Sequence, residues 1–225
     1  IRAATSLADL CAHCSGPSGV VVVSVAGEAA ERAVFLGPGG LVESAAPGTL
    51  LVGCGTVTVQ LAREVHDACD AAGLLFLDAP VSGGPEGARL GTLSIMAGGG
   101  AEAFSRAQDS GAFRALGSFA ALMGGPGAGA AAKLVNQQLV SVNQMAATEG
   151  LALARSLGID DAASLEQLLD LLSRSWGNST MLQRSGGILR DALLLKEKEM
   201  EKEMERERER EGGQSDGDAA VEAAL

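Results

Sequence analysis

One stretch of the sequence limits the fold more than any other, and it runs from Asp78 to Gly99 as DAPVSGGPEGARLGTLSIMAGG. It follows the apolar residues 74–77 and leads through a glycine-rich turn into a second apolar run at Leu93. Short apolar runs bounded by turn residues predict buried strands. We expect the chain to leave a strand at Asp78 and to open a loop at its carboxyl end, where open α/β sheets bind ligands. An ordinary strand-to-turn connection is the alternative.

Three residues of this loop favour the binding of an anion. Ser82 places a hydroxyl beside Gly83 and Gly84, which have no Cβ. Backbone N–H groups can therefore close on an anion such as a carboxylate. The loop thus predicts a pocket for a small acid.

A second segment, GGPGAGAAAKLVNQQ from Gly124, begins as a glycine turn and continues as an alanine-rich helix. Lys133, Asn136 and Gln137 are spaced i, i+3 and i+4, so they are neighbours on one helical face. The positive end of the helix dipole lowers the pKa of a nearby lysine and favours the neutral amine, which suits a general acid/base. A solvated lysine on an amphipathic helix is the alternative.

Together these two segments resemble the β-hydroxyacid dehydrogenase family, which includes 3-hydroxyisobutyrate, L-threonate and tartronate semialdehyde enzymes. The first segment resembles the family's D-x-P-V-S-G-G, G-x-L and M-x-G-G pattern, and the second its G-x-G-x-x-x-K pattern with an amide three and four residues on. The matching residues are Asp78, Pro80, Val81, Ser82, Gly83, Gly84, Gly91, Leu93, Met96, Gly98 and Gly99, then Gly127, Gly129, Lys133, Asn136 and Gln137. Many members have Asn in place of Gln137, and the Asn-Gln pair is more similar to the threonate-type branch, so the substrate stays open.

The resemblance implies hydride transfer between NAD or NADP and a small β-hydroxy acid, giving a semialdehyde or keto acid. Lys133 would exchange the hydroxyl proton as general acid/base. The carboxylate would lie against Ser82, Gly83 and Gly84. The two amides, Asn136 and Gln137, would orient the substrate.

The resemblance also implies cofactor contacts in the first half of the chain. Val25 and Ala26 stand where the family more often has Leu-Pro after a strand, and Thr56 stands in the place of a family threonine. A dinucleotide domain should open with a strand and a G-x-G-x-x-G turn, and this sequence has no such opening. The similar string at residues 125–130 is not followed by a βαβ unit. We therefore expect an N-terminally truncated family member.

The expected fold class is α/β: a partial Rossmann-type sheet lacking its first βαβ segment, followed by an all-α domain with a long interdomain helix. Residues 1–125 would form a partial dinucleotide-binding domain of the 6-phosphogluconate dehydrogenase type, and residues 126–195 an incomplete helical dehydrogenase domain. Strands are expected at residues 20–25, 50–54, 74–78, 93–98 and 119–123, and helices at 1–10, about 128–157 and 162–173. Trp176 is expected to cover a boundary between helices.

Residues 196–225 read as a charged low-complexity tail. In KEKEMEKEMERERERE, acidic residues take every odd position and basic residues or methionine every even one. In a helix, i and i+4 then carry like charges while i and i+3 carry opposite ones, so side-chain support is weak. We expect a solvated, loosely helical or largely disordered segment, with a charged interaction tail as the functional alternative.

Composition excludes some classes of partner. The net charge of −11 argues against nucleic acid and anionic membrane surfaces, and there is no apolar run long enough to span a membrane. Cys11 and Cys14 form one C-x-x-C, but no second pair or spaced histidine completes a metal set and His66 stands alone. We expect reduced thiols, no metal, and a cytoplasmic or organellar-matrix location.

Three kinds of function remain open from the sequence. The chain is an NAD(P)-dependent 3-hydroxyacid dehydrogenase by resemblance, with homo-oligomerisation through the long helix. As an alternative, it is a catalytically impaired relative that acts as a binding or dimerisation module. A merely structural fragment is the third.

Overall fold

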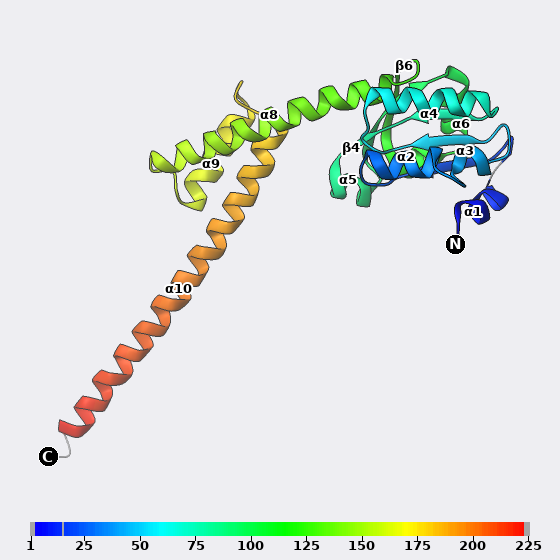
Figure 1. Cartoon of the computed structure of the whole chain (residues 1–225). Coiled ribbons are helices and arrows are strands. Elements are labelled where there is room, and N and C mark those ends of the chain that lie inside the picture. The colour runs from blue at the N-terminus through cyan, green and yellow to red at the C-terminus, as the bar shows by residue number, and fades with distance from the viewer. Residues whose placement is uncertain (1–2, 15, 223–225) are drawn as a thin grey trace. The chain divides into compact units, whose positions relative to one another are not determined.

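The structure is a computed structural model that describes residues 3–14 and 16–222, with side chains described as far as Arg206. The chain divides into two compact units, Ile1–Gln137 and Gln138–Leu225, and each is described by itself. The helix α8 (Ala128–Ser156) belongs to the first unit as far as Gln137. Figure 1 follows the chain by colour from the N-terminus to the C-terminus and labels most of the helices.

The first unit is built on a mixed sheet. Its strands are β1 (Val20–Val23), β2 (Leu50–Gly53), β3 (Leu75–Asp78), β4 (Val81–Ser82), β5 (Leu93–Gly99) and β6 (Gly117–Gly124). The strand order is β1-β2-β3-β5-β4, and β6 pairs with β5. Strands β1, β2 and β3 are parallel, β5 runs antiparallel to β3 and β4, and β6 is parallel to β5. The carboxyl ends of β1, β2 and β3 therefore meet at one edge.

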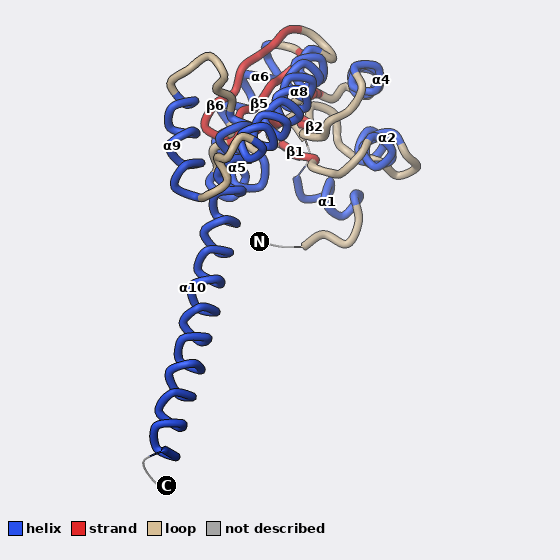
Figure 2. Tube along the Cα trace, turned by 90° about the vertical axis from the view of Figure 1, so that its left-hand side faces the viewer, coloured by secondary structure: helices blue, strands red, loops and turns tan. Residues whose placement is uncertain are grey.

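Helices pack on both sides of this sheet, as Figure 2 shows. They are α1 (Leu7–Cys14), α2 (Glu28–Leu36), α3 (Leu41–Ser44), α4 (Val59–Ala71), α5 (Gly84–Leu90), α6 (Ala101–Asp109) and α7 (Ala112–Leu116). Alternate residues of each strand face opposite sides of a sheet. Leu51 and Phe76 accordingly pack with α1, α2, α3 and α4, whereas Val52 and Leu77 pack with α6 and α7. Burial on both faces explains why these strands read as continuous apolar runs.

The predicted strands are each found within a few residues of the expected bounds, but the first helix is displaced. It was expected at residues 1–10 and lies instead at Leu7–Cys14. The cause is a local cap, because the backbone N–H of Asp9 donates to Ser6 Oγ at 3.1 Å and that of Thr5 donates to Asp9 Oδ2 at 2.9 Å. These bonds satisfy N–H groups that a helix leaves unpaired in its first turn. Residues 1 and 2 lie outside the described residues.

The second unit is a helical cluster. It holds the remainder of α8, α9 (Ala162–Ser173) and α10 (Thr180–Glu222), and its apolar core includes Leu151, Leu165, Leu169 and Leu182. The helix α8 ends before Gly158, whose φ of 92° is a left-handed conformation typical of a glycine that follows a helix. The helix α9 matches the predicted bounds and begins after Asp161, whose Oδ1 accepts from Ser164 N at 2.8 Å.

Two expectations for the second unit need correction. Trp176 covers no boundary between helices, because its side chain is fully exposed in the connection from α9 to α10. Leucines of the two helices already close that contact. The charged run is not wholly solvated either, since Glu197 is half-buried and its Oε1 accepts from Ala162 N at 3.0 Å. The run continues as helix to Glu222.

Candidate functional site

The carboxyl edge of β1 and β2 carries the three residues predicted to contact a cofactor. Val25 is half-buried after β1, while Ala26 is exposed there and Thr56 is exposed after β2. The two loops are tied together by Glu28, whose carboxylate accepts from the N–H and the hydroxyl of Thr58 at 3.2 and 3.1 Å. Sequence reasoning placed these loops correctly at strand ends, and their role stays a prediction.

A buried acid lies beneath the same loops. Glu31, on α2, is only 3% exposed, and its Oε2 has no hydrogen-bond partner. Burial raises the pKa of Glu31 to about 7, and a backbone hydrogen bond from Gly55 opposes the rise. A Cβ at Gly53 would lie 2.9 Å from Glu31 Oε1, and one at Gly55 would overlap Oε2. The two glycines therefore provide the space that this carboxyl occupies.

Asp78 joins the end of β3 to the start of α8. Its buried carboxylate accepts from Gly127 N at 3.0 Å through Oδ1 and from Ala130 N at 2.8 Å through Oδ2. Oδ1 also lies within hydrogen-bond distance of His66 Nε2, at 3.0 Å. The first N–H groups of a helix have no partner within the helix, so this carboxylate satisfies them. The sequence assigned no role to Asp78 and His66 was considered only as a metal ligand, so this contact was not predicted.

Lys133 lies one turn further along α8, and it is 8% exposed. Its Nζ donates to the carbonyl oxygen of Val81 at 2.7 Å. Val81 immediately precedes Ser82 in β4, so the structure brings the predicted base to the predicted anion loop. The pKa of Lys133 is lowered as expected, but the cause is burial rather than the helix dipole that the sequence suggested.

The anion loop has the backbone that its glycines predict. Gly83 and Gly84 have φ of 136° and 65°, which residues with a side chain rarely adopt. A Cβ at Gly83 would also lie 3.0 Å from Leu93 Cδ2. Ser82 is half-buried, while both glycines are exposed and accessible to a ligand.

The two predicted amides lie further along the same helix. Asn136 is half-buried and Gln137 is exposed. Asn136 Nδ2 donates to Gln137 Oε1 at 3.3 Å, so the pair is linked at the helix surface. Their action on a substrate stays a prediction.

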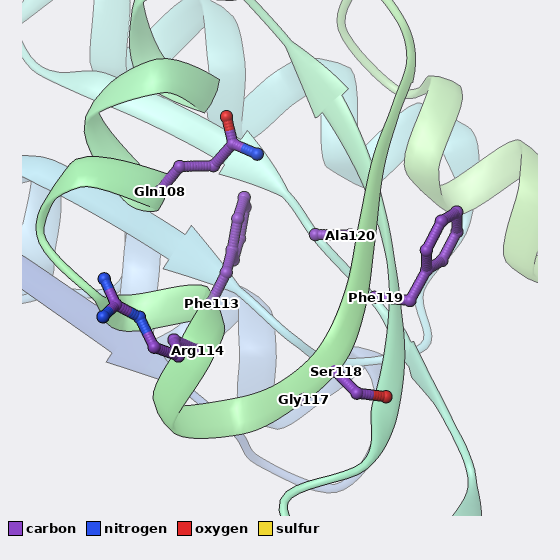
Figure 3. Close-up of a pocket in the computed structure, with 7 residues that line it drawn as sticks. All are labelled: Gln108, Phe113, Arg114, Gly117, Ser118, Phe119 and Ala120. Atoms are coloured by element: carbon purple, nitrogen blue, oxygen red, sulfur yellow. The ribbon is translucent and has the colours of Figure 1, made fainter.

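Other hollows lie apart from these residues. One is lined by Gln108, Phe113, Arg114 and residues 117–120 of β6. Figure 3 shows Gln108 and Phe113 on one side of that strand and the ring of Phe119 on the other. Among the residues that the structure describes, no group of three or more His, Cys, Asp or Glu side chains is placed to hold a metal ion. In the same part of the chain, no helix is long and apolar enough to cross a membrane.

A mixed α/β sheet of Rossmann type, followed by helices and joined to them by a glycine turn and a long helix, defines a nucleotide-dependent dehydrogenase fold. Residues 1–125 match the family described as NAD binding domain of 6-phosphogluconate dehydrogenase, and residues 127–193 match NAD-binding of NADP-dependent 3-hydroxyisobutyrate dehydrogenase. The chain belongs to the β-hydroxyacid dehydrogenase family, and the predicted fold class is confirmed.

Known relatives agree with this assignment. The NAD-dependent L-serine dehydrogenase of Pseudomonas aeruginosa is 39% identical over 150 residues, which cover 67% of this chain and 48% of that protein. The 3-hydroxyisobutyrate dehydrogenase of the same organism is 38% identical over 163 residues, covering 72% and 54%. The solved structure of Psf3 in complex with NADP+ and 2-OPP has a TM-score of 0.73 at 25% identity and covers 82% of this chain and 62% of that one. The chain spans about half the length of the curated relatives it matches.

The family's cofactor is NAD or NADP, and the residues present at the carboxyl edge fit part of it. That edge offers the Thr56 hydroxyl, the small apolar side chain of Ala26 and the half-buried Val25. A hydroxyl beside small apolar groups suits a ribose and an uncharged ring face. The cofactor prediction is therefore confirmed at the level of the family.

Proposed function

We propose that this chain carries the substrate and proton-transfer residues of an NAD(P)-dependent oxidoreductase that interconverts a small β-hydroxy acid and its semialdehyde or keto acid. The observation that carries the proposal is the hydrogen bond from Lys133 Nζ to Val81 O at 2.7 Å. It holds a buried amine at the residue next to Ser82. A solvated surface lysine would have no such contact.

Lys133 acts as the general acid/base in this proposal. Burial lowers its pKa, so a larger fraction of the amine is neutral near neutral pH and can accept the substrate hydroxyl proton. The same group returns the proton when the reaction runs in reverse. The nicotinamide, when bound, supplies the hydride acceptor or donor.

The remaining predicted residues bind and orient. Ser82 donates its hydroxyl to the substrate carboxylate, and the accessible backbone at Gly83 and Gly84 lets N–H groups approach the same anion. Asn136 and Gln137 hold the substrate hydroxyl toward Lys133. Contacts from Val25, Ala26 and Thr56 orient the cofactor at the carboxyl edge.

The domain roles and the location form part of the same proposal. Residues 1–125 bind the cofactor, residues 126–195 form the helical part, and residues 196–225 are a charged extension. The thiols of Cys14, Cys54 and Cys69 are free, and free thiols persist in a reducing compartment such as the cytoplasm or an organellar matrix.

We also propose that the chain forms a homo-oligomer through α8. In the second unit Leu139, Val142 and Met145 are 59%, 51% and 65% exposed. They recur every three residues and so form an apolar stripe on one side of the helix. A second copy of the chain would bury this stripe.

The test is turnover by the 225-residue chain. L-Serine, 3-hydroxyisobutyrate and L-threonate are each supplied with NAD+ or NADP+, and reduced cofactor is followed at its near-ultraviolet absorbance. We expect reduction with at least one acid. Binding of cofactor and acid by the folded chain without any reduction would instead support the binding or dimerisation module.

A further inference from the structure

We propose that Asp78 is a positioning residue for Lys133 and that His66 fixes the orientation of the Asp78 carboxylate. The inference rests on the proposed function for its catalytic meaning. The position of the Lys133 amine is argued only from contacts within the first unit.

The first step is that Asp78 is hydrogen-bonded to the start of α8. Each of its two carboxylate oxygens accepts from a backbone N–H of the segment that opens this helix, namely Gly127 and Ala130. The residue is 3% exposed, so water does not compete for these bonds. A carboxylate with two fixed N–H donors is held in both position and plane, and the first turn of the helix is held with it.

The second step is that two contacts join α8 to the segment 78–81, so that the residues form a closed ring. On α8, Ala130 and Lys133 are about one helical turn apart. On the other segment, Asp78 and Val81 are three positions apart in the chain. The bond from Lys133 Nζ to Val81 O closes the ring on the other side. Any shift of the first turn of α8 relative to β3 therefore moves the Lys133 amine relative to Ser82.

The close approach of strand and helix leaves this ring little freedom. A Cβ at Gly98 of β5 would lie 2.5 Å from Gly129 N and 2.7 Å from Asp78 Oδ1. The start of α8 therefore packs directly against β5, with no side chain between the two backbones. A small shift of α8 toward β5 would bring backbone atoms into contact. The hydrogen bonds of Asp78 therefore determine where the first turn of α8 lies.

The third step is the support from His66. Its Nε2 lies 3.0 Å from Asp78 Oδ1, and we assign the ring hydrogen to Nε2, because both oxygens of Asp78 already act as acceptors for backbone N–H groups. His66 is 5% exposed, and its imidazole packs edge-on against Phe76, with ring centroids 4.7 Å apart. The ring is therefore fixed by packing, and it fixes the carboxylate in turn.

The experiment titrates Lys133 in the folded 225-residue chain. The sequence has four lysines, and the other three, Lys196, Lys198 and Lys202, are exposed in the charged run and give reference signals. Protein carrying 13C-labelled lysine is followed by NMR at the Cε signal, and Lys133→Arg assigns the Lys133 peak. Asp78→Asn is the main variant, because it keeps the shape but replaces one acceptor oxygen with a donor.

A paired substitution at the histidine keeps the test decisive if Asp78→Asn does not fold. His66→Leu removes the donor, and His66→Gln can replace it with an amide N–H. Thr49→Val is the matched control, since Thr49 is fully buried in the same unit and its Oγ1 accepts from Gly16 N at 2.6 Å. This control weakens the unit without touching α8.

We expect Asp78→Asn to raise the pKa of Lys133 toward that of an exposed lysine, because the amine leaves its buried contact. His66→Leu should shift it in the same direction by less, His66→Gln should restore it, and Thr49→Val should leave it unchanged. An unchanged Lys133 titration in a folded Asp78→Asn or His66→Leu protein would overturn the inference. If Lys133→Ala keeps normal turnover, the proposed function fails, while the titration still decides whether Asp78 places the amine.

Discussion

Lys133 Nζ and Val81 O are 2.7 Å apart although the two residues are separated by 52 positions in the sequence. The contact joins the second predicted signature to the first, since Val81 belongs to the strand that leads into the anion loop. It also explains why a lysine is tolerated at a buried position, because its charged end has a hydrogen-bond acceptor.

The buried acid gives a prediction for stability against pH. The pKa of Glu31 is raised from 4.5 to about 7 in the folded chain, so the folded state holds this proton more tightly than the unfolded state. Its contribution is fully present below pH 4.5 and is lost as the pH rises through about 7. The loss amounts to about 3 kcal/mol in the free energy of unfolding.

Glu31→Gln tests this loss, because glutamine stays neutral throughout. In urea denaturation between pH 4 and 8, the free energy of unfolding of the variant should increase relative to that of the wild type as the pH rises. Glu102→Gln, at an exposed position of the same unit, should keep the wild-type slope. Equal slopes for Glu31→Gln and wild type would refute the assignment.

Close packing of α8 against β5 gives a second prediction. Gly98→Ala places a methyl group 2.5 Å from Gly129 N, so helix and sheet must separate. We expect a loss of about 2 kcal/mol or more in the free energy of unfolding. In the nearby turn, Gly125→Ala meets nothing within 4 Å and should change stability by less than about 0.5 kcal/mol. Similar values for the two variants in urea titrations would contradict the packing account.

The anion loop gives a third prediction. Ser82→Ala removes a hydroxyl that donates to the substrate carboxylate, and a hydrogen bond to a charged group contributes about 1.5–3 kcal/mol. The KM for the acid should rise roughly tenfold or more, while the cofactor Kd stays unchanged. Ser94→Ala is the matched control, because Ser94 pairs in register with Ser82 on the adjacent strand. A KM unaffected by Ser82→Ala would remove Ser82 from the carboxylate site.

The apolar stripe on α8 gives a fourth prediction. Val142→Glu places a charge in the centre of the stripe, and an unpaired buried charge is costly. We expect dimers to dissociate, as measured by sedimentation velocity. Ser141→Glu adds the same charge at the neighbouring exposed position on another side of the helix and should leave the dimer intact. A monomeric wild-type chain at all concentrations would disprove the oligomer proposal.

Local patterns predicted most of the elements, because strands, capped helices and glycine turns depend on neighbouring residues. The helix Ala162–Ser173 was located to the residue from the leucines that recur on one side of it. The partners of Asp78 could not be predicted in this way. They come from positions 12, 49 and 52 residues away, and periodicity carries no information on such contacts.

The burial of Glu31 could not be predicted from its neighbours in the sequence either. A glutamate in the first turn of a helix reads as a solvated residue, and its burial depends on space left by Gly53 at the end of β2 and Gly55 in the loop after it. Trp176 is the converse case, since a lone aromatic residue suggests burial and its side chain is fully exposed. An acid that closes a buried strand, as Asp78 does, is the one available signal that a distant donor must exist.

The most direct test of the central claim is the turnover of Lys133→Ala compared with the wild-type chain on the best acid and cofactor. If Lys133 transfers the hydroxyl proton, kcat should fall about 10²–10⁴-fold. The cofactor Kd should stay unchanged, since Lys133 is held at Val81 rather than at the carboxyl edge of β1 and β2. A Lys133→Ala protein with the kcat of the wild type would contradict the account.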